Sequence, residues 1–386
     1  MSMTQDNLTF LFAALREAVG GTPLTEAEQA LCTADTWPDI VRVAQKHAVE
    51  AAVAHTVRAH RLVDDPAVQN TITLATVGYE LLNYEQNHIA DLLGAADIRF
   101  MPLKGAVMRR FYTQPWMRSS CDIDVLVPSD ELDRAVALLT EQHGYTVLHK
   151  GAHDVALKAK SGIHLELHYA LLDEGVSPAW EAALGDVWAT ATPRADRPYW
   201  YEMPDEVFYL YHVIHMAKHF LGGGCGIKPF LDLWLLDRLP DVDRQKRDDL
   251  LGQGDLLAFT ASVQKQTDVW FRGAAADPIA EQIEAYVLRG GVYGNATNRV
   301  AVHQRQAGGR LGFLLKNVFL PYRILQFHYP ILQKHRWLMP VMQVRRWGKL
   351  IFGGHLRRIR KKVAYSQSIS ADEARATARF LTDVGL

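Results

Sequence analysis

The spacing of the apolar residues changes at Asp97, and this change restricts the chain to a fold that contains both helices and a sheet. Before Asp97 the apolar residues recur at helical spacing, as Leu8, Leu11 and Leu15 do, which indicates one buried helix face. After it come short segments such as CDIDVLV and IHLELHYAL, whose alternating apolar residues are typical of strands. Their order predicts a β-α-β-α-β-β-β unit of about 75 residues. The predicted fold class is therefore α+β.

Helical spacing returns after Leu172, for example in the segment EVFYLYHVIHMAKHF. We therefore expect four regions along the chain. They are an N-terminal helical region (1–96), an α/β core (97–172), a second helical region (173–290) and a basic, mostly helical C-terminal region (291–386).

Two aspartates, Asp122 and Asp124, stand two positions apart in the strand candidate CDIDVLV. Side chains at i and i+2 of a strand point to the same face, so these carboxylates lie side by side. The apolar Ile123, Val125 and Val127 then face the core. A divalent cation relieves the repulsion between two such carboxylates, and Mg²⁺ prefers one or two of them together with substrate phosphates.

A third acid, Glu166, lies on the strand candidate that runs from Ile163 to Leu167, on the same face as His164 and His168. If this strand is the neighbour of the Asp-Ile-Asp strand, Glu166 completes a cluster of three carboxylates. Such a cluster suits two-metal phosphoryl transfer, in which one ion activates the attacking oxygen and the other holds the triphosphate.

Candidate phosphate-binding residues lie upstream of these acids. Lys104 and Gly105 occupy a strand-to-helix turn, where glycine permits close backbone approach and the helix N-terminus offers free N–H groups. Arg118 and Ser119 stand just before the Asp-Ile-Asp strand and offer a guanidinium and a hydroxyl to the same phosphates.

Each of these features also has a plain structural interpretation. A lone Asp-x-Asp is a common accident of sequence, and HLELH is compatible with an edge strand that has a solvated polar face. Their order favours the metal site: a glycine turn, Arg-Ser, Asp-Ile-Asp and a later acid all fall within one small unit.

The run LKGAVMRRFYTQPWMRSSCDIDVLV resembles the DNA polymerase β-like nucleotidyltransferase superfamily, and more narrowly its uncharacterised nucleotidyltransferase family. The shared features are an L-K-G turn, an R-x-S-x-D-I-D strand, a downstream acid-x-H strand and an H-x-x-K-H helix. The resemblance extends to VIHMAKHF, FLDLWLLDR and the C-terminal VYGNATNRVAVHQRQ and VRRWGK. It implies a small mixed-sheet nucleotidyltransferase core flanked by helical regions.

By this resemblance Asp122, Asp124 and Glu166 are metal ligands, with Glu166 also a candidate general base. The resemblance implies Mg²⁺ or Mn²⁺ as cofactor and a nucleoside triphosphate as substrate. It also implies that Lys104 and Gly105 hold the phosphates. Ala106 departs from the superfamily, whose turn usually carries a serine after the glycine, so Lys104 or Ser119 compensates or turnover is weak.

The predicted helix around residue 215 carries His212, His215 and His219 on one face, with Lys218 beside them. A zinc site, a packing role and a substrate-facing role all remain open, although no acid or cysteine of the same helix completes a zinc site. The resemblance includes His215, Lys218 and His219 and also the position of His168, which makes these four candidates to face the substrate. Lys228, after a glycine loop, is a further candidate that adds positive charge at the cleft.

The net charge of −1 conceals a strong asymmetry. The segment 285–371 contains 16 Lys and Arg and no Asp or Glu, which leaves 26 basic and 43 acidic residues elsewhere. Three interpretations remain open: a solvated face that neutralises the acidic remainder, a tract that binds RNA or another anionic acceptor, and, less favoured, a basic helix on an anionic membrane surface. The densest cluster comprises Arg345, Arg346, Lys349, Arg357, Arg358, Arg360, Lys361 and Lys362.

The three separated cysteines and the absence of a signal-peptide pattern lead us to expect a cytoplasmic protein. The expected activity is metal-dependent transfer of a nucleoside monophosphate from a nucleoside triphosphate to an unknown acceptor, with release of pyrophosphate. RNA, a peptide or protein, and a small molecule are all candidate acceptors. The alternative is a catalytically weak protein of the same fold that binds nucleic acid or a partner protein through its basic C-terminal region.

Overall fold

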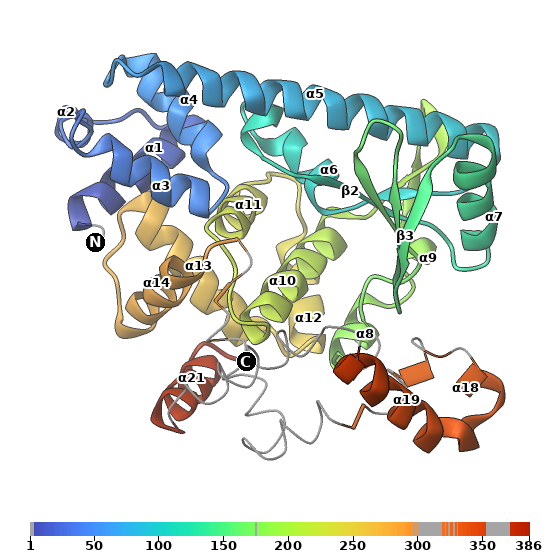
Figure 1. Cartoon of the computed structure of the whole chain (residues 1–386). Coiled ribbons are helices and arrows are strands. Elements are labelled where there is room, and N and C mark those ends of the chain that lie inside the picture. The colour runs from blue at the N-terminus through green and yellow to red at the C-terminus, as the bar shows by residue number, and fades with distance from the viewer. Residues whose placement is uncertain are drawn as a thin grey trace.

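The computed structural model describes residues 4–173, 176–292, 331–352 and 371–386, with residues 294, 295, 298, 319, 320, 322, 325, 326 and 329. These residues form helices and one main sheet, so the predicted α+β class is confirmed. The N-terminal helices are α1 (Gln5–Gly20), α2 (Glu26–Gln29), α3 (Trp37–Lys46), α4 (Glu50–His60) and α5 (Pro66–Ala95). Figure 1 shows α5 extending from the N-terminal helices to the sheet, so it links both parts.

Local sequence signals fix the ends of these helices. Thr25 and Glu28 form a capping box at the start of α2. The carboxylate of Asp65 accepts a hydrogen bond from the backbone of Ala67, and Pro66 stands in the first turn, where its missing N–H costs nothing. Helix α5 therefore begins at Pro66.

The main sheet has five strands in the order β1-β2-β5-β4-β3. Its strands are β1 (Met101–Pro102), β2 (Asp122–Leu126), β3 (Thr146–Lys150), β4 (Asp154–Lys158) and β5 (His164–His168). The helical elements between them are α6 (Lys104–Met108), the 3₁₀ turns η1 (Arg109–Phe111) and η2 (Pro115–Met117), α7 (Leu132–Ala137) and the π-helical turn η3 (Leu138–Gln142). Only β2 and β5 pair in parallel, so the sheet is mixed, as expected.

The pairing of β2 with β5 decides what the polar face of the sheet can do. The condition set by the sequence, that these strands are neighbours, is confirmed, and Asp124 lies directly opposite Glu166 in the register. Ile123, Val125 and Val127 face the other side, where α5 and α7 cover them in a hydrophobic core. One face of the sheet is therefore apolar and packed, and the carboxylates occupy the opposite face.

The chain after the sheet forms the wall opposite those carboxylates. Its elements are α8 (Pro178–Leu184), α9 (Val187–Thr190), β6 (Thr192–Arg194), β7 (Arg197–Glu202), α10 (Asp205–Leu221), α11 (Lys228–Leu236), α12 (Arg244–Gln253), α13 (Leu257–Arg272) and α14 (Pro278–Gly290). Buried residues of α10, α11 and α13 share one hydrophobic core with α1, α3 and α4. The four sequence regions stay a prediction, since this core joins the first to the third.

The hairpin β6–β7 lies in a segment expected to be helical only. The sequence did not predict this hairpin because its strands contain Pro193 and Pro198, and proline within a run argues against a strand. A parallel bridge between Phe100 and Trp200 attaches the hairpin to the chain before β1. It therefore extends the sheet side of the molecule.

The described part of the C-terminal region contains α18 (Ile331–Lys334), the 3₁₀ turn η4 (Arg336–Leu338), α19 (Met339–Phe352) and α21 (Ala371–Asp383). Phe380 and Leu381 of α21 are buried in the main core, which ties the end of the chain to α14. Arg345, Arg346 and Lys349 lie on α19, and the basic residues between 357 and 362 lie outside the described residues. In the described part of the chain, no helix has both the length and the apolarity needed to cross a bilayer.

Candidate functional site

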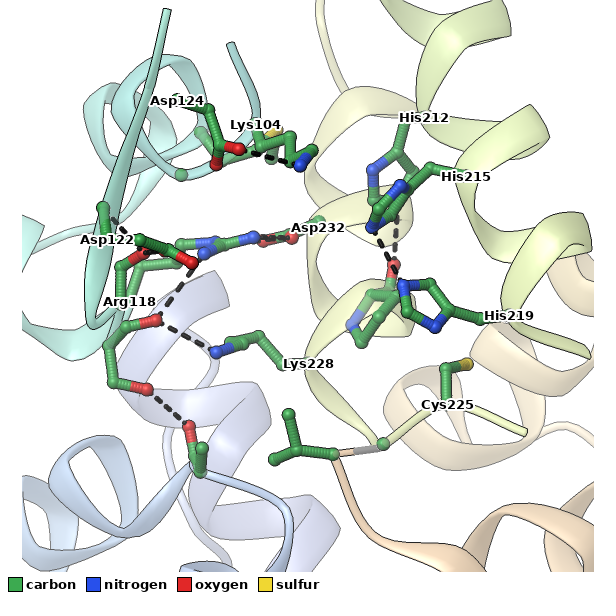
Figure 2. A pocket seen from close by; sticks show the side chains of 18 of the residues that line it. Lys104, Arg118, Asp122, Asp124, His212, His215, His219, Cys225, Lys228 and Asp232 are labelled. Atoms are coloured by element: carbon green, nitrogen blue, oxygen red, sulfur yellow. Dashed lines mark hydrogen bonds and ion pairs between the residues drawn. The ribbon is translucent and has the colours of Figure 1, made fainter. Parts of the chain in front are cut away.

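A pocket of about 590 Å³ lies between the polar face of the sheet and helices α10 and α11. Figure 2 shows Asp122, Asp124 and Lys104 on one side and the three histidines of α10 on the other. Lys228 and Cys225 lie below them in this view. Ten predicted site residues line this pocket, and His168 and Lys218 lie outside its lining. The ten are Lys104, Gly105, Arg118, Ser119, Asp122, Asp124, Glu166, His215, His219 and Lys228.

Asp124 is the centre of the polar network in this pocket. Its Oδ1 accepts hydrogen bonds from Lys104 Nζ at 2.7 Å and from His168 Nε2 at 2.9 Å. Burial alone would raise the pKa of Asp124, but the bond from His168 and the charge of Lys104 outweigh it and hold this pKa well below its usual range. Asp124 is therefore ionised although only 5% of it is exposed.

Glu166 completes a group of three side chains that can hold a metal ion. Ligand atoms of Asp124, Glu166 and His168 all lie within 4.8 Å of one another, and this is the one such group among the residues that the structure describes. Asp122 lines the same pocket but its Oδ1 accepts from Ser120 Oγ at 3.0 Å. Burial and the charge of Asp124 raise the pKa of Asp122. Two acids of the expected cluster, Asp124 and Glu166, thus belong to this group. Its third member is His168 and not Asp122.

Lys104 bridges the two facing acids. Its ammonium lies 2.7 Å from Asp124 and 3.9 Å from Glu166. Burial would lower the pKa of Lys104, but the charges of these acids raise it above its usual value, so the side chain stays protonated. Its φ of +44° is in the left-handed region that residues with a Cβ seldom adopt, and such strain concentrates at functional sites.

Arg118 is held by α11. Its Nη2 donates to Asp232 Oδ2 at 2.7 Å, and its Nε lies 3.1 and 3.2 Å from the two carboxylate oxygens. Burial would lower the pKa of Arg118, but the charge of Asp232 raises it. The guanidinium is charged and faces the pocket, yet its strongest partner is a buried carboxylate.

The neighbouring residues pack this turn against the rest of the pocket. Ser119 Oγ donates to the carbonyl of Ala48 at 2.8 Å, and Lys228 Nζ donates to the carbonyl of Ser119 at 2.9 Å. A Cβ on Gly105 would lie 3.1 Å from both Arg118 Nη1 and Ser120 Oγ, so glycine allows the close approach here. Burial and the charge of Arg118 lower the pKa of Lys228 to about 8.

The histidines of α10 do not gather into a metal site in the described structure. His212 Nε2 lies 2.9 Å from the carbonyl of Pro229, and the Nε2 atoms of His215 and His219 lie 3.0 Å apart. Burial, reinforced by His219, holds the pKa of His215 well below its usual value. His215 is therefore neutral, and the pair forms a polar wall opposite the acids. Lys218 is bound to Asp173 at 2.5 Å.

His47 and Glu50 are among the lining residues that the sequence did not single out. His47 directly follows α3 and Glu50 is the first residue of α4. A single histidine in a helical region produces no periodic signal, and only the packing of the N-terminal helices against α11 brings this turn to the site. No motif could have found them.

Comparison with known proteins identifies a family for this chain. Residues 33–272 match the family described as uncharacterised nucleotidyltransferase. The curated proteins contain no match. A solved structure of the antibiotic-resistance factor ANT(2'')-Ia, whose title reports substrate-regulated conformation dynamics, shares 13% identity over 52% of this chain and 91% of that chain, with a TM-score of 0.25.

The family match is the basis of the assignment, because it spans more than half of the chain and includes every residue that lines the pocket except Val292. It confirms the resemblance seen in the sequence. The chain belongs to the uncharacterised nucleotidyltransferase family and is an enzyme of the nucleotidyltransferase class.

Proposed function

We propose that the pocket binds a nucleoside triphosphate with Mg²⁺ or Mn²⁺ and transfers its nucleoside monophosphate to an acceptor. An acceptor oxygen attacks the α-phosphorus, the bond from that phosphorus to the oxygen bridging to the β-phosphorus breaks, and pyrophosphate leaves. The acceptor proton passes to Glu166, which is part exposed and faces the pocket. The observation that carries this proposal is the pairing of Asp124 with Glu166 across the parallel strands.

The donor set fits a hard divalent cation. Carboxylate oxygens of Asp124 and Glu166 are the ligands that Mg²⁺ and Mn²⁺ prefer, and Asp122 is the third acid of the same pocket. His168 Nε2 donates to Asp124, so His168 would orient this carboxylate for a bound ion. A bound ion supplies neutralisation of the triphosphate charge and polarisation of the reacting phosphoryl group.

Lys104 has a defined part in this arrangement. Its ammonium and a divalent cation need the same two carboxylates, because Lys104 already lies 2.7 Å from Asp124. If these carboxylates held the cation, the Lys104 ammonium would be available to the triphosphate. Arg118 and Lys228 add positive charge farther along the pocket, where it can attract the phosphates.

The test is pyrophosphate release from four labelled nucleoside triphosphates with RNA, peptide and small-molecule acceptors. We expect release that requires Mg²⁺ or Mn²⁺ and disappears with EDTA. A Glu166→Gln variant is expected to lose about 10²-fold or more in rate, since it lacks both the ligand and the base. The proposal fails if wild type and Glu166→Gln release pyrophosphate equally with every nucleotide and acceptor.

Affinity for the triphosphate is expected to fall as the pH rises through the pKa of Lys228, which is about 8. Below this pKa the ammonium attracts the phosphates, and above it the neutral amine does not. From about pH 7 to about pH 9 the affinity should fall roughly fivefold to tenfold by proton linkage. Calorimetric titration of nucleotide with Mg²⁺ measures this change.

The matched control is Lys228→Met, which has no titrating group at this position. Its affinity should be weaker at about pH 7 and nearly constant over the same range. A pH profile of Lys228→Met that is as steep as that of wild type would place the titrating group elsewhere.

The acceptor is proposed to be RNA, a peptide or protein, or a small molecule. RNA is included because α19 carries Arg345, Arg346 and Lys349, and Trp337 just before this helix is 75% exposed. Basic side chains meet phosphates and exposed aromatic rings stack on bases. Arg345 and Lys349 lie over the ring of Tyr329, which orients their charges.

A further inference from the structure

His47 carries polar atoms that no group in the described part of the chain uses. The residue is fully buried, and neither ring nitrogen has a hydrogen-bond partner in the described part of the chain. Buried side-chain nitrogens almost always have partners, because an unpaired one loses its bonds to water without compensation. His47 also lines the candidate pocket.

Glu50 adds a second unused polar atom to the same place. Its Oε2 is buried and has no partner among the described residues, and its side chain also lines the pocket. Burial raises the pKa of Glu50, and burial with the charge of Lys46 lowers the pKa of His47 to about 4. At neutral pH the imidazole is therefore uncharged and offers one donor and one acceptor.

The position of these residues separates them from the carboxylates. A Cβ on Gly226 would lie 3.3 Å from His47 Nδ1, so His47 adjoins Gly226. Cys225 is the residue before Gly226 in the chain. Figure 2 shows Cys225 and Lys228 toward the end of the pocket away from Asp124 and Lys104. A triphosphate that reaches from Lys104 past Lys228 thus directs the rest of the nucleotide toward His47.

The walls at this end suit a flat ring. Ala48, Gly226 and Val292 line it, and all three have small side chains or none. The Gly226 position is confined, since an added Cβ would be 3.3 Å from both His47 Nδ1 and the Val292 Cα. Small apolar walls with a few convergent polar groups are the usual surroundings of a planar ligand whose edge is polar.

We propose that His47 and Glu50 bind the edge of the nucleobase and determine which nucleoside triphosphate the enzyme accepts. This inference rests on the proposed function, because it assumes that the phosphates lie at the Lys104 end. A nucleobase presents neighbouring donors and acceptors on a neutral edge, which matches a neutral imidazole beside a carboxyl group. A base with the wrong pattern would leave both protein groups unpaired, and this is the condition that gives strong discrimination.

The test compares the binding of ATP, CTP, GTP, UTP and inorganic tripolyphosphate, each with Mg²⁺, by calorimetry. Wild type is expected to prefer one of the four nucleotides by about tenfold to a hundredfold. His47→Leu should reduce this preference to about threefold or less and leave tripolyphosphate binding unchanged. Glu50→Gln, which replaces an acceptor by a donor, should change the order of preference.

His55→Leu is the matched control. His55 is another histidine of the N-terminal helices with a buried Nδ1 that has no partner in the described structure, but its ring packs against Trp116 and does not line the pocket. It should keep the wild-type preference. If His47→Leu does not fold, as judged by its melting temperature, His47→Gln and Glu50→Gln supply the answer, since both retain polar groups.

The results separate this inference from the proposed function. Wild type that binds neither tripolyphosphate nor any nucleotide contradicts both. Wild type that binds all four nucleotides equally, or variants that keep the wild-type ratios, overturns the base-reading role and leaves the phosphate site intact. A loss of preference without a loss of tripolyphosphate binding supports it.

Discussion

Asp124→Asn is expected to lower the rate of nucleotidyl transfer by about 10³-fold, whereas Asp122→Asn should cost only about tenfold to a hundredfold. Asp124 faces Glu166 in the register and has ligand atoms within 4.8 Å of it. Asp122 is turned toward Ser120. The loss of a carboxylate that would hold the cation should remove several kcal/mol of charge stabilisation from the transition state. Asp124 belongs to the group with Glu166 and Asp122 does not, so the loss of Asp124 should cost more.

The measurement is pyrophosphate release under saturating nucleotide and Mg²⁺, with Mn²⁺ binding followed in parallel. Asp196→Asn is the matched control, because Asp196 is exposed, pairs with Arg194 and lies on the β6–β7 turn away from the pocket. Melting temperatures show whether Lys104 and His168, which lose a charged partner, destabilise the variant. Equal losses at Asp122 and Asp124 would contradict the unequal roles inferred from the geometry.

The strands and the polar face of the sheet were predictable because side-chain direction in a strand depends only on position parity. The sequence therefore placed Asp122 and Asp124 on one face and Ile123 on the other, and the structure agrees. The pairing of Asp124 with Glu166 could be stated only as a condition. Strand order is set by tertiary packing, and 42 positions separate these two acids.

Other features could not be read from local pattern. The partner of Arg118 is Asp232, 114 positions away on α11, so a residue expected to contact phosphate also has a structural role. The turn with His47 reaches the pocket only because the helices before and after the sheet share one core. The interpretation of the basic segment stays open, since its densest part lies outside the described residues.

Asp232→Ala is expected to lower the free energy of unfolding by about 3–5 kcal/mol, the usual cost of leaving one member of a buried ion pair without its partner. Asp232 is fully buried and accepts hydrogen bonds from Arg118 at 2.7 Å and from the hydroxyl of Tyr112 at 2.7 Å. Its removal leaves a buried guanidinium and a buried hydroxyl without their acceptor. Urea denaturation of wild type and variant measures the difference, and a loss below about 1 kcal/mol would contradict this account.

A triple variant, Tyr112→Phe/Arg118→Met/Asp232→Leu, removes all three polar groups and isolates the contribution of charge. Its stability should lie within about 2 kcal/mol of wild type, because apolar replacement of a buried ion pair is often neutral. If Arg118 also contacts the triphosphate, as its position in the pocket lining suggests, the stable triple variant will bind tripolyphosphate with Mg²⁺ at least about tenfold more weakly. Unchanged binding would restrict Arg118 to fixing α11 against the turn before β2, and Lys104 and Lys228 would then supply the positive charge for the phosphates.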